Sequence, residues 1–345
     1  MEKIRPTIID VARQAGVSKS TVSYAMRNSP LITNATKKKI QSIARKMGYL
    51  PSMVYSIMGS GNRMKGTRSN LLPLAYLHDN PSETESNKYY FKLLAESALS
   101  YGYYLDPYDI SKFDSARKLE NVLFQCGYCG VIIGRVMSDK SLAYELDLSK
   151  FIVVFYSNTL WNSKYHRVSD DVFNAVQIAW DRTVEAGYRR IGVTPCCHSP
   201  SVPDDELRLA AVLQRQKRDV ETVEEIPPFT GNPGDMTSFK AWIKKWRPDA
   251  VIGFQSQHYY CLKDMGFKIP RNIGYAGLFV YPQDKWSNFI SGILDQERRV
   301  AETSISVIDQ EIRKRTIGIP EQVLTVLLEP QWSEGKTLLK GNVRK

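Results

Sequence analysis

Residues 7–23 have the sequence TIIDVARQAGVSKSTVS, and this stretch decides how the amino end of the chain folds. Thr7 followed three residues later by Asp10 is the start signal of a short helix. Gly16 is expected at a tight turn that requires a positive φ angle. Ser18 can cap a second helix that ends at Met26. The buried positions expected at helical spacing are Ile8, Val11, Ala12 and Ala15, followed by Thr21, Val22, Ala25 and Met26.

A third helix is predicted after these two. Thr33 can cap it, and Gly48 lies just past its end. A helix, a glycine turn, a second helix and a supporting helix together predict helix-turn-helix geometry. The apolar positions of the third helix are Ile40, Ile43, Ala44 and Met47.

The charge of the chain is concentrated in this segment. The 345 residues include 47 Lys and Arg and 36 Asp and Glu, which gives a net charge of +11. Residues 1–68 hold thirteen Lys and Arg against Glu2 and Asp10, so the whole excess lies there and residues 69–345 are neutral. A basic segment on a neutral body is typical of a polyanion-binding module. Composition alone would equally allow a solubilising basic arm, but the helical patterning argues against that alternative.

Length and composition exclude several classes of protein. With 43% hydrophobic and 24% charged residues, the chain can bury sizeable cores, and its length favours two or three domains. No apolar run approaches the length of a membrane span, and Met1–Asp10 contains no secretory segment. The five cysteines are an odd set, which argues against a disulfide framework. We therefore expect a soluble, cytoplasmic protein.

Residues 7–23 closely resemble the headpiece of the lactose-repressor/galactose-repressor (LacI/GalR) family, and residues 48–51 resemble the lead into its hinge helix. A match of this length is far more specific than a short motif. The resemblance implies a transcription regulator, most often a repressor in this family, that binds a pseudo-palindromic DNA operator as a homodimer. It also implies an architecture. This is an α-helical helix-turn-helix headpiece (1–50), a hinge helix and linker (51–68), and an α/β two-lobed periplasmic-binding-protein-like sensor and dimerisation domain with parallel, doubly wound sheets (69–345).

The resemblance places the second helix in the major groove of DNA. Lys19 and Ser20, at its exposed first turn, are the candidates for contacts to base edges. Tyr24 stands where many relatives carry arginine, which predicts a shifted operator preference or a ring packed on the headpiece surface. For Lys37–Lys39, phosphate contact and a solvated helix face both remain open. The candidates near the phosphate backbone are Thr7, Ser18, Thr21, Ser23, Arg27, Thr33 and Thr36.

Residues 51–58 are too few for a stable isolated helix. By resemblance, they fold only when two copies meet in the minor groove, where an apolar side chain kinks the duplex. Met58 occupies a position that is usually leucine and is the expected wedge. Val54 is expected to hold the two hinges together, and Tyr55 replaces a usual small residue.

Residues 69–345 alternate apolar strand-like runs with helical patterns, which favours parallel sheets in α/β layers and two similar lobes. The tail after Leu328 has no sustained leucine heptads, so a dimer is expected and not a coiled-coil tetramer. The predicted strands are Leu71–Leu77, Tyr103–Tyr108, Gly130–Ile133, Phe151–Tyr156, Ile191–Thr194, Ala250–Phe254, Ile273–Leu278 and Val323–Leu328, and the predicted helices include Tyr90–Tyr101, Val172–Ala186 and Gln296–Arg313.

Ligands of such folds bind at the carboxyl ends of strands. The acidic and amide pairs of many family members are replaced here by Asp171-Val172, Gln255-Ser256 and Phe279-Val280. Since carboxylates and amides hold sugar hydroxyls, we expect an effector that is not an ordinary neutral sugar, a more apolar one, or none. Arg208 stands where an arginine of the family commonly reaches the effector. The candidate wall residues, each of which could also be plain core or surface, are Tyr89, Tyr90, Arg135, Tyr156, Arg208, Phe254, Ser256 and Phe279.

Two cysteine motifs could in principle form metal or redox sites. Cys126 and Cys129 form a C-x-x-C, and Cys196-Cys197-His198 is a second cluster, but zinc needs four ligands and no second C-x-x-C exists. Small buried side chains at strand ends are the simplest interpretation, a redox pair at Cys126 and Cys129 is the alternative, and no metal is expected.

No H-E-x-x-H motif, catalytic triad or nucleotide loop is present, so neither a cofactor nor enzymatic activity is expected. A solute-binding or enzymatic α/β protein with an incidental basic arm is the competing class. The absence of a signal peptide and of a catalytic constellation argues against it.

Overall fold

The structure is a computed structural model, and some site predictions lie outside the residues that it describes. These are Thr7, Arg27, Val54, Tyr55 and Met58. The described residues are 8–26, 31–47, 71–79, 85–136, 140–161, 163–199, 201–232, 234–254, 256–281 and 289–339.

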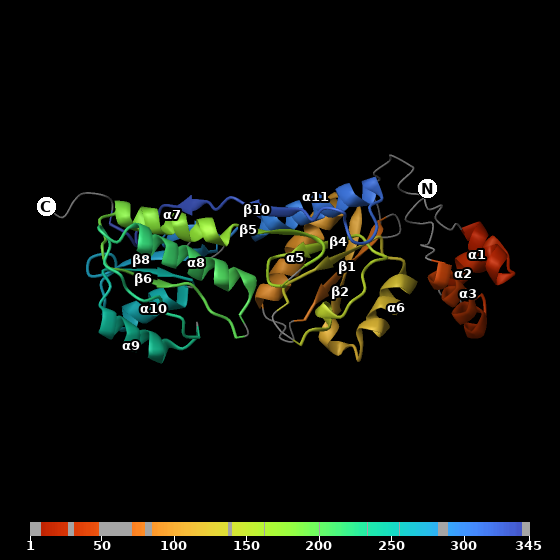
Figure 1. The fold of residues 1–345 in the computed structure, drawn as a ribbon, viewed down its shortest axis with the longest axis horizontal. Coiled ribbons are helices and arrows are strands. Elements are labelled where there is room, and N and C mark those ends of the chain that lie inside the picture. Colours follow the sequence, from red (N-terminus) through yellow and green to blue (C-terminus); the bar gives the residue numbers. More distant parts are fainter. Residues whose placement is uncertain are drawn as a thin grey trace. The chain divides into compact units, whose positions relative to one another are not determined.

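Three helices near the amino end pack around a small apolar core (Figure 1). They are α1 (Ile8–Ala15), α2 (Lys19–Met26) and α3 (Asn34–Met47), as the spacing predicts. Gly16, between α1 and α2, has a φ of +68°, a conformation that costs glycine little and other residues more. The core is formed by Val11, Ala12, Ala15, Val22, Ala25, Met26, Ile40 and Ala44, all buried.

The chain divides into two compact units, each assembled from separate stretches of sequence. The first unit contains the chain up to Ser157 together with Asn162–Val168 and Arg298–Thr325. The second unit contains Asn158–Trp161, Ser169–Glu297 and the chain from Val326 onward.

Most of a six-stranded sheet, in the order β10-β5-β4-β3-β1-β2, belongs to the first unit, while the end of β5 and most of β10 are assigned to the second. Strands β2, β1, β3, β4 and β5 pair in parallel. Helices α5 and α6 form the crossovers from β1 to β2 and from β2 to β3, whereas the described parts of the connections to β4 and β5 contain no α-helix. Two of the covering helices share one face, because Tyr76 of β1 contacts Phe91 of α5 and a Cβ on Gly130 of β3 would meet Ile308 of α11. The elements are β1 (Leu72–His78), α5 (Glu85–Ser100), β2 (Tyr103–Asp109), η2 (Ile110–Lys112), α6 (Ala116–Cys126), β3 (Gly130–Ile133), η3 (Leu142–Tyr144), β4 (Val153–Tyr156), β5 (His166–Asp170), α11 (Glu297–Lys314) and β10 (Thr325–Leu328).

A five-stranded sheet carries the second unit, in the order β11-β9-β8-β7-β6, and β11 pairs antiparallel to β9. Its other four strands, β6 to β9, pair in parallel, so their carboxyl ends lie at the same edge of the sheet. The elements are α7 (Val172–Glu185), β6 (Ile191–Thr194), α8 (Pro203–Arg218), α9 (Met236–Trp246), β7 (Ala250–Gly253), α10 (Ser256–Asp264), β8 (Gly274–Val280), β9 (Ser291–Leu294) and β11 (Trp332–Ser333).

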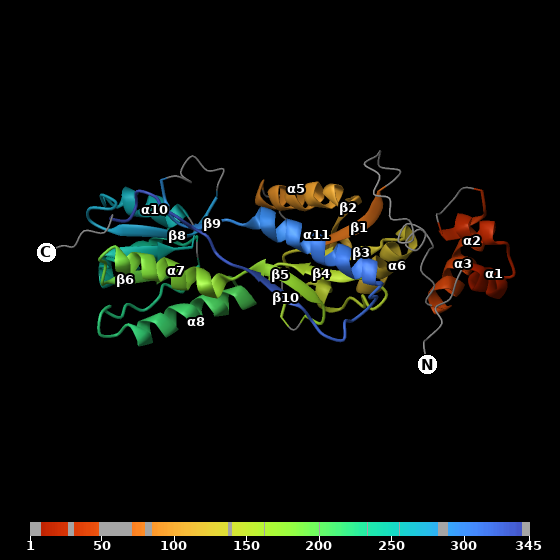
Figure 2. The same cartoon turned by 90° about the horizontal axis from the view of Figure 1, so that it is seen from above.

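Both faces of this second sheet are buried. Ala250 and Ile252 of β7 pack into the same cluster as Trp180 of α7, whereas Val251 packs into the cluster of Phe239 of α9. Successive strand residues point to opposite faces, so this division follows from the period of two. Figure 2 accordingly shows α7 and α8 on one side of the sheet and α10 on the other. The predicted doubly wound α/β fold is confirmed.

All eight predicted strands are present: β3 and β6 have the predicted bounds and the other six have shifted ends. Three further strands of the described residues were missed. β5 contains His166, Arg167 and Asp170, and β9 starts with a serine and a glycine, so both lack a continuous apolar run, while β11 has two residues. Phe151, predicted to start a strand, closes a turn instead, because its N–H donates to the carbonyl of Leu148.

The prediction that the cysteines are small buried side chains is wrong for Cys126. It is the last residue of α6 and is exposed, because the buried face of that helix is formed by Leu119 and Leu123. Cys129 is buried, and both thiols are free.

Among the described residues, none of the helices combines the length and the hydropathy needed to cross a membrane.

Candidate functional site

The turn between α1 and α2 presents the amino end of α2. Ser18 caps this helix: its Oγ accepts a hydrogen bond from the Thr21 N–H at 3.1 Å and lies 2.8 Å from the hydroxyls of Ser20 and Thr21. The N–H groups of a helix start point outward and attract anions such as phosphate. This end of α2 can therefore lie against a nucleic-acid backbone.

The predicted base-reading residues lie on the surface of that helix. Lys19 and Ser20 are exposed at its first turn, while Thr21, Ser23 and Tyr24 are half-buried. Val22 and Ala25, on the opposite side, are fully buried. The side of α2 that carries Lys19 and Ser20 therefore faces solvent, and the side that carries Val22 and Ala25 faces the core.

A buried glutamine holds the headpiece together in a way that the sequence did not indicate. The Gln41 side chain of α3 donates a hydrogen bond of 2.8 Å to the carbonyl of Ala25, near the end of α2. A helix end leaves carbonyls without intrahelical partners, so this contact satisfies one of them and fixes α3 against α2. The sequence around Gln41 does not indicate this role, because the hydrogen-bond partner belongs to another helix.

The third helix starts with a second hydroxyl pair. Thr33 Oγ1 accepts from the Thr36 N–H at 3.2 Å and lies 2.8 Å from the Thr36 hydroxyl. Thr33 is exposed and Thr36 half-buried. Beyond them Lys38 and Lys39 are exposed, and Lys37 donates to Asn34 at 3.4 Å.

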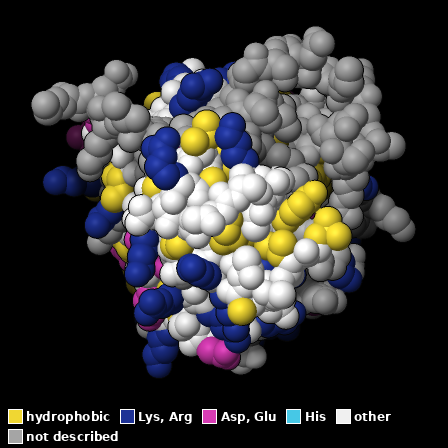
Figure 3. All heavy atoms as spheres, turned by 90° about the vertical axis from the view of Figure 1, so that its right-hand side faces the viewer, with side chains coloured by type: hydrophobic (Ala, Val, Ile, Leu, Met, Phe, Trp, Pro, Cys, Tyr) yellow, Lys and Arg dark blue, Asp and Glu magenta, His cyan; other side chains and the backbone are white. Residues whose placement is uncertain are grey.

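The described part of the headpiece is strongly basic. Its only acidic residue is Asp10, which forms an exposed ion pair of 3.6 Å with Arg13. Figure 3 shows many Lys and Arg side chains at this end of the molecule and few Asp or Glu side chains. Such a surface attracts a polyanion at long range.

The candidate effector residues fall into two sets, one in each unit. In the first unit, the Arg135 guanidinium lies 4.1 Å from the centre of the Tyr90 ring, and Tyr89 contacts the same ring at 5.9 Å. Tyr156 is fully buried at the end of β4. This set therefore contains one aromatic–cation cluster and one core residue.

In the second unit, Arg208 and Phe279 line one pocket. Phe254 lies between them: the guanidinium of Arg208 is 4.7 Å from its ring centre, and the Phe279 ring is 5.2 Å away. Ser256 starts α10 and is half-buried. The lining is mainly apolar and consists of Asp170, Asp171, Val172, Ala175, Arg208, Leu278, Phe279, Ile293, Leu294, Gln296 and Pro330.

Arg208 is held by a buried carboxylate. Its guanidinium donates to Asp205 at 2.6 Å and to the Pro195 carbonyl at 2.6 Å, and both charged side chains are buried. Burial alone would raise the pKa of Asp205, but hydrogen bonds from His198 and the charge of Arg208 outweigh it, so this pKa lies below its ordinary value. Asp205 is thus an anion that positions Arg208 at the pocket.

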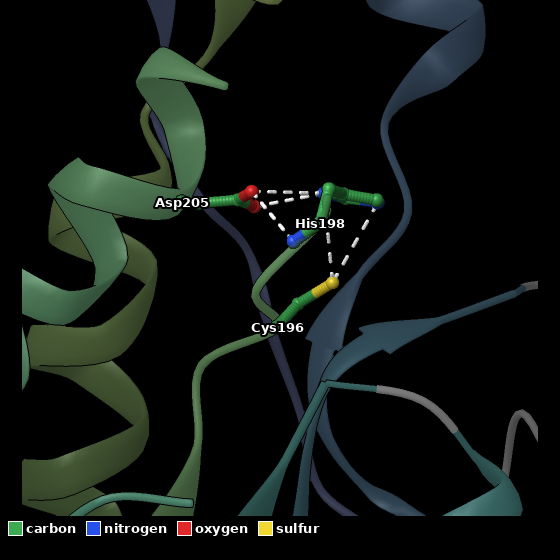
Figure 4. Close-up of side chains that lie close together, drawn as sticks. All are labelled: Cys196, His198 and Asp205. Atoms are coloured by element: carbon green, nitrogen blue, oxygen red, sulfur yellow. Dashed lines mark hydrogen bonds and ion pairs between the residues drawn. The ribbon is translucent and has the colours of Figure 1, made fainter. Parts of the chain in front are cut away.

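The same carboxylate reaches a cysteine–histidine pair in the loop after β6. Asp205 accepts from the His198 N–H at 2.8 Å and lies 2.9 Å from His198 Nδ1, and the Cys196 Sγ lies 3.7 Å from Nε2 (Figure 4). Burial raises the pKa of the Cys196 thiol to about 12. The sequence shows the Cys-His pair, but not Asp205, which comes from the first turn of α8.

Comparison with known proteins points to one family for the headpiece. Residues 7–52 match the model of the bacterial regulatory proteins of the lacI family. Over 47 residues, 14% of each chain, the sequence is 49% identical to the probable HTH-type transcriptional repressor ExuR of Bacillus subtilis.

Other relatives extend over the rest of the chain. The HTH-type transcriptional repressor PurR of Pectobacterium atrosepticum is 22% identical, with 98% of each chain covered. Catabolite control protein A of Staphylococcus epidermidis is 24% identical over 77% of this chain and 80% of its own.

Solved structures share the fold of the whole chain. The lac repressor dimer bound to operator and the anti-inducer ONPF superimposes with a TM-score of 0.61 at 17% identity, covering 97% of this chain and 100% of that one. A complex of the transcriptional regulator CelR with cellobiose also gives 0.61, at 16% identity and with 96% and 100% covered.

Proposed function

Because this chain is a DNA-binding transcription regulator of the LacI/GalR family, we propose that it acts as a repressor, in which a homodimer binds a pseudo-palindromic operator with one α2 helix in each half-site. The main support for this proposal is the start of α2, which is capped by Ser18 and exposes Lys19 and Ser20 on a basic headpiece. A helix presented in this way fits the major groove, and two-fold symmetry of the protein matches two half-sites. Binding to an operator also implies that the protein works in the cytoplasm.

The remaining DNA contacts follow the same geometry. Lys19, Ser20 and Tyr24 face base edges, and the hydroxyl caps at the two helix starts face phosphates. Residues 1–50 form the headpiece, 51–68 the hinge and linker, and 69–345 the sensor and dimerisation domain. The proposed phosphate contacts are Thr7, Ser18, Thr21, Ser23, Arg27, Thr33 and Thr36, and the proposed minor-groove residues are Val54, Tyr55 and Met58.

A retention experiment with genomic fragments tests this function. The purified full chain is offered a fragment library at two salt concentrations, and the bound DNA is sequenced. A regulator retains a few fragments at the higher salt, because base contacts survive when phosphate contacts are screened. The proposal is contradicted if no fragment is retained. It is also contradicted if all fragments are retained at the lower salt concentration and none at the higher.

Lys19→Ala separates base contact from phosphate contact. We expect it to weaken operator binding by about 1–3 kcal/mol and to relax the preference at one base pair in each half-site. Binding to random DNA should change much less. Lys39→Ala, at an exposed position of α3, serves as a matched control for the loss of one positive charge. Equal losses on operator and random DNA would reassign Lys19 to a phosphate.

We further propose that a small molecule more apolar than a common hexose controls DNA binding from the sensor domain. Phe279 lines the pocket in the second unit and packs against the Phe254 ring at 5.2 Å, and Asp171 uses a carboxylate oxygen to cap α7 through the Asn174 N–H at 2.9 Å. The polar groups available for sugar hydroxyls are reduced accordingly. The candidate contacts are Tyr89, Tyr90, Arg135, Tyr156, Arg208, Phe254, Ser256 and Phe279.

Titration calorimetry of the full chain against common hexoses checks this effector class. No heat of binding is expected at millimolar concentrations. Binding of any of these hexoses with a dissociation constant of about 1 mM or below would overturn the proposed chemistry, but it would leave the DNA-binding function untouched.

A further inference from the structure

The loop that follows β6 brings three metal-ligating side chains together. Cys196 and His198 come from the loop itself, and Asp205 reaches them from the first turn of α8. Cys196 adopts a φ of +67°, which is costly for a residue with a side chain. This backbone conformation accompanies a thiol that is 3% exposed and turned toward the histidine (Figure 4).

We propose that Cys196, His198 and Asp205 bind a soft divalent cation such as Zn²⁺. A thiolate, an imidazole nitrogen and a carboxylate oxygen are the donor types that zinc prefers in proteins, and three such ligands with one water are typical of an open site. Among the described residues, this is the group of three Cys, His and acidic side chains whose ligand atoms lie close enough to share one ion.

The distances fit a shared cation. Zinc binds sulfur at about 2.3 Å and nitrogen or oxygen at about 2.0–2.2 Å, so tetrahedral ligand atoms lie roughly 3.3–3.6 Å apart. Sγ of Cys196 lies 3.7 Å from Nε2 and 3.8 Å from Nδ1 of His198, and Nδ1 lies 2.9 Å from Asp205 Oδ1. These separations lie close to the expected range, and the three ligand atoms all lie within 4.8 Å of one another, so the side chains must shift to close in on the ion.

The histidine has room to make this shift. Sγ is almost equally far from both ring nitrogens, so a turn about the Cβ–Cγ bond aims a nitrogen at the ion. The His198 side chain is 34% exposed, whereas the Asp205 side chain is 3% exposed. The partly exposed ring is accessible to a water ligand from solvent, while the buried carboxylate provides a fixed point.

The surroundings hold the ligands in place. Asp205 is oriented by the His198 N–H at 2.8 Å and by Arg208 at 2.6 Å, and Phe254 packs edge-on against the His198 ring at 6.4 Å. Such outer contacts orient ligands and raise metal affinity. Because Asp205 also holds Arg208, the cation would lie next to the arginine that lines the pocket.

Zinc titration of the reduced, chelator-treated, tag-free full chain tests the site. We expect one Zn²⁺ per chain by calorimetry, and Co²⁺ should give the near-ultraviolet thiolate charge-transfer absorption of a cysteine ligand. Cys196→Ser and His198→Ala should each weaken Zn²⁺ binding at least about tenfold. Cys197→Ser and Cys126→Ser remove neighbouring and exposed thiols and serve as controls that should bind as the unchanged protein does.

A second variant keeps the test decisive if Cys196→Ser fails to fold. His198→Gln changes a partly exposed side chain and should retain the unfolding temperature of the zinc-free protein while losing Zn²⁺ affinity. The proposal is overturned by the absence of Zn²⁺ binding, or by binding that survives Cys196→Ser and His198→Gln and is lost in Cys197→Ser. Operator binding measured without zinc tests the proposed function independently of this site, so failure of the site and failure of the proposed function are distinguishable.

Discussion

Val22→Asp is expected to reduce operator binding at least about 100-fold while the sensor domain stays folded. Val22 is fully buried where α2 packs on α1 and α3. An unpaired carboxylate there costs several kcal/mol, and a unit of about 40 residues has little stability to offset this. Each 1.4 kcal/mol of lost headpiece stability beyond that margin lowers the apparent affinity about tenfold.

The control for this variant is Ser42→Asp. It adds the same charge at an exposed position of α3, so it should weaken binding only a few-fold through repulsion of the phosphates. Operator affinity is measured by fluorescence anisotropy, and the folding of the sensor domain by thermal melting. Val22→Asp that binds within about threefold of the unchanged protein would mean that α2 is not packed as described.

Trp180→Ala is expected to lower the free energy of unfolding of the second unit by about 3–5 kcal/mol. Trp180 is fully buried in α7, packs with Val176 and Val212, and donates from its indole Nε1 to Asp219 at 2.9 Å. The substitution removes this packing and leaves the Asp219 contact unmade. Urea unfolding followed by circular dichroism measures the change.

Two further variants separate the contribution of the Trp180 hydrogen bond from that of its packing and provide an exposed control position. Trp180→Phe retains most of the ring and loses the hydrogen bond, so it should cost about 1–2 kcal/mol. Leu213→Ala, at a position 50% exposed on α8, should change stability by less than about 0.5 kcal/mol. A loss below about 1 kcal/mol for Trp180→Ala would contradict a well-packed interface between α7 and α8.

The parts of the fold that could be predicted are those in which local pattern and tertiary environment agree. Gly16, Ser18 and Thr33 each perform the turn or capping role that their residue types favour. The buried parallel strands such as β3 and β6 are continuous apolar runs. At these positions the residue types alone are sufficient to predict the local structure.

The missed features depend on partners that no local sequence pattern indicates. His166 fits into β5 because its Nδ1 accepts from the Leu324 N–H at 2.9 Å, a contact that no pattern around residue 166 reveals. The Cys-His cluster alone offers too few ligands to predict a metal site, and Asp205, which lies beside it, comes from the start of α8. The DNA-contact and effector assignments remain predictions.

The interleaved sequence of the two units affects how the protein is made on the ribosome. The three headpiece helices end at Met47, so they can fold soon after they emerge. The sheet of the first unit cannot be completed then, because its edge strand β10 and its covering helix α11 are translated after residues 169–296. During synthesis, a folded DNA-binding module would therefore precede the two completed α/β sheets by most of the translation time.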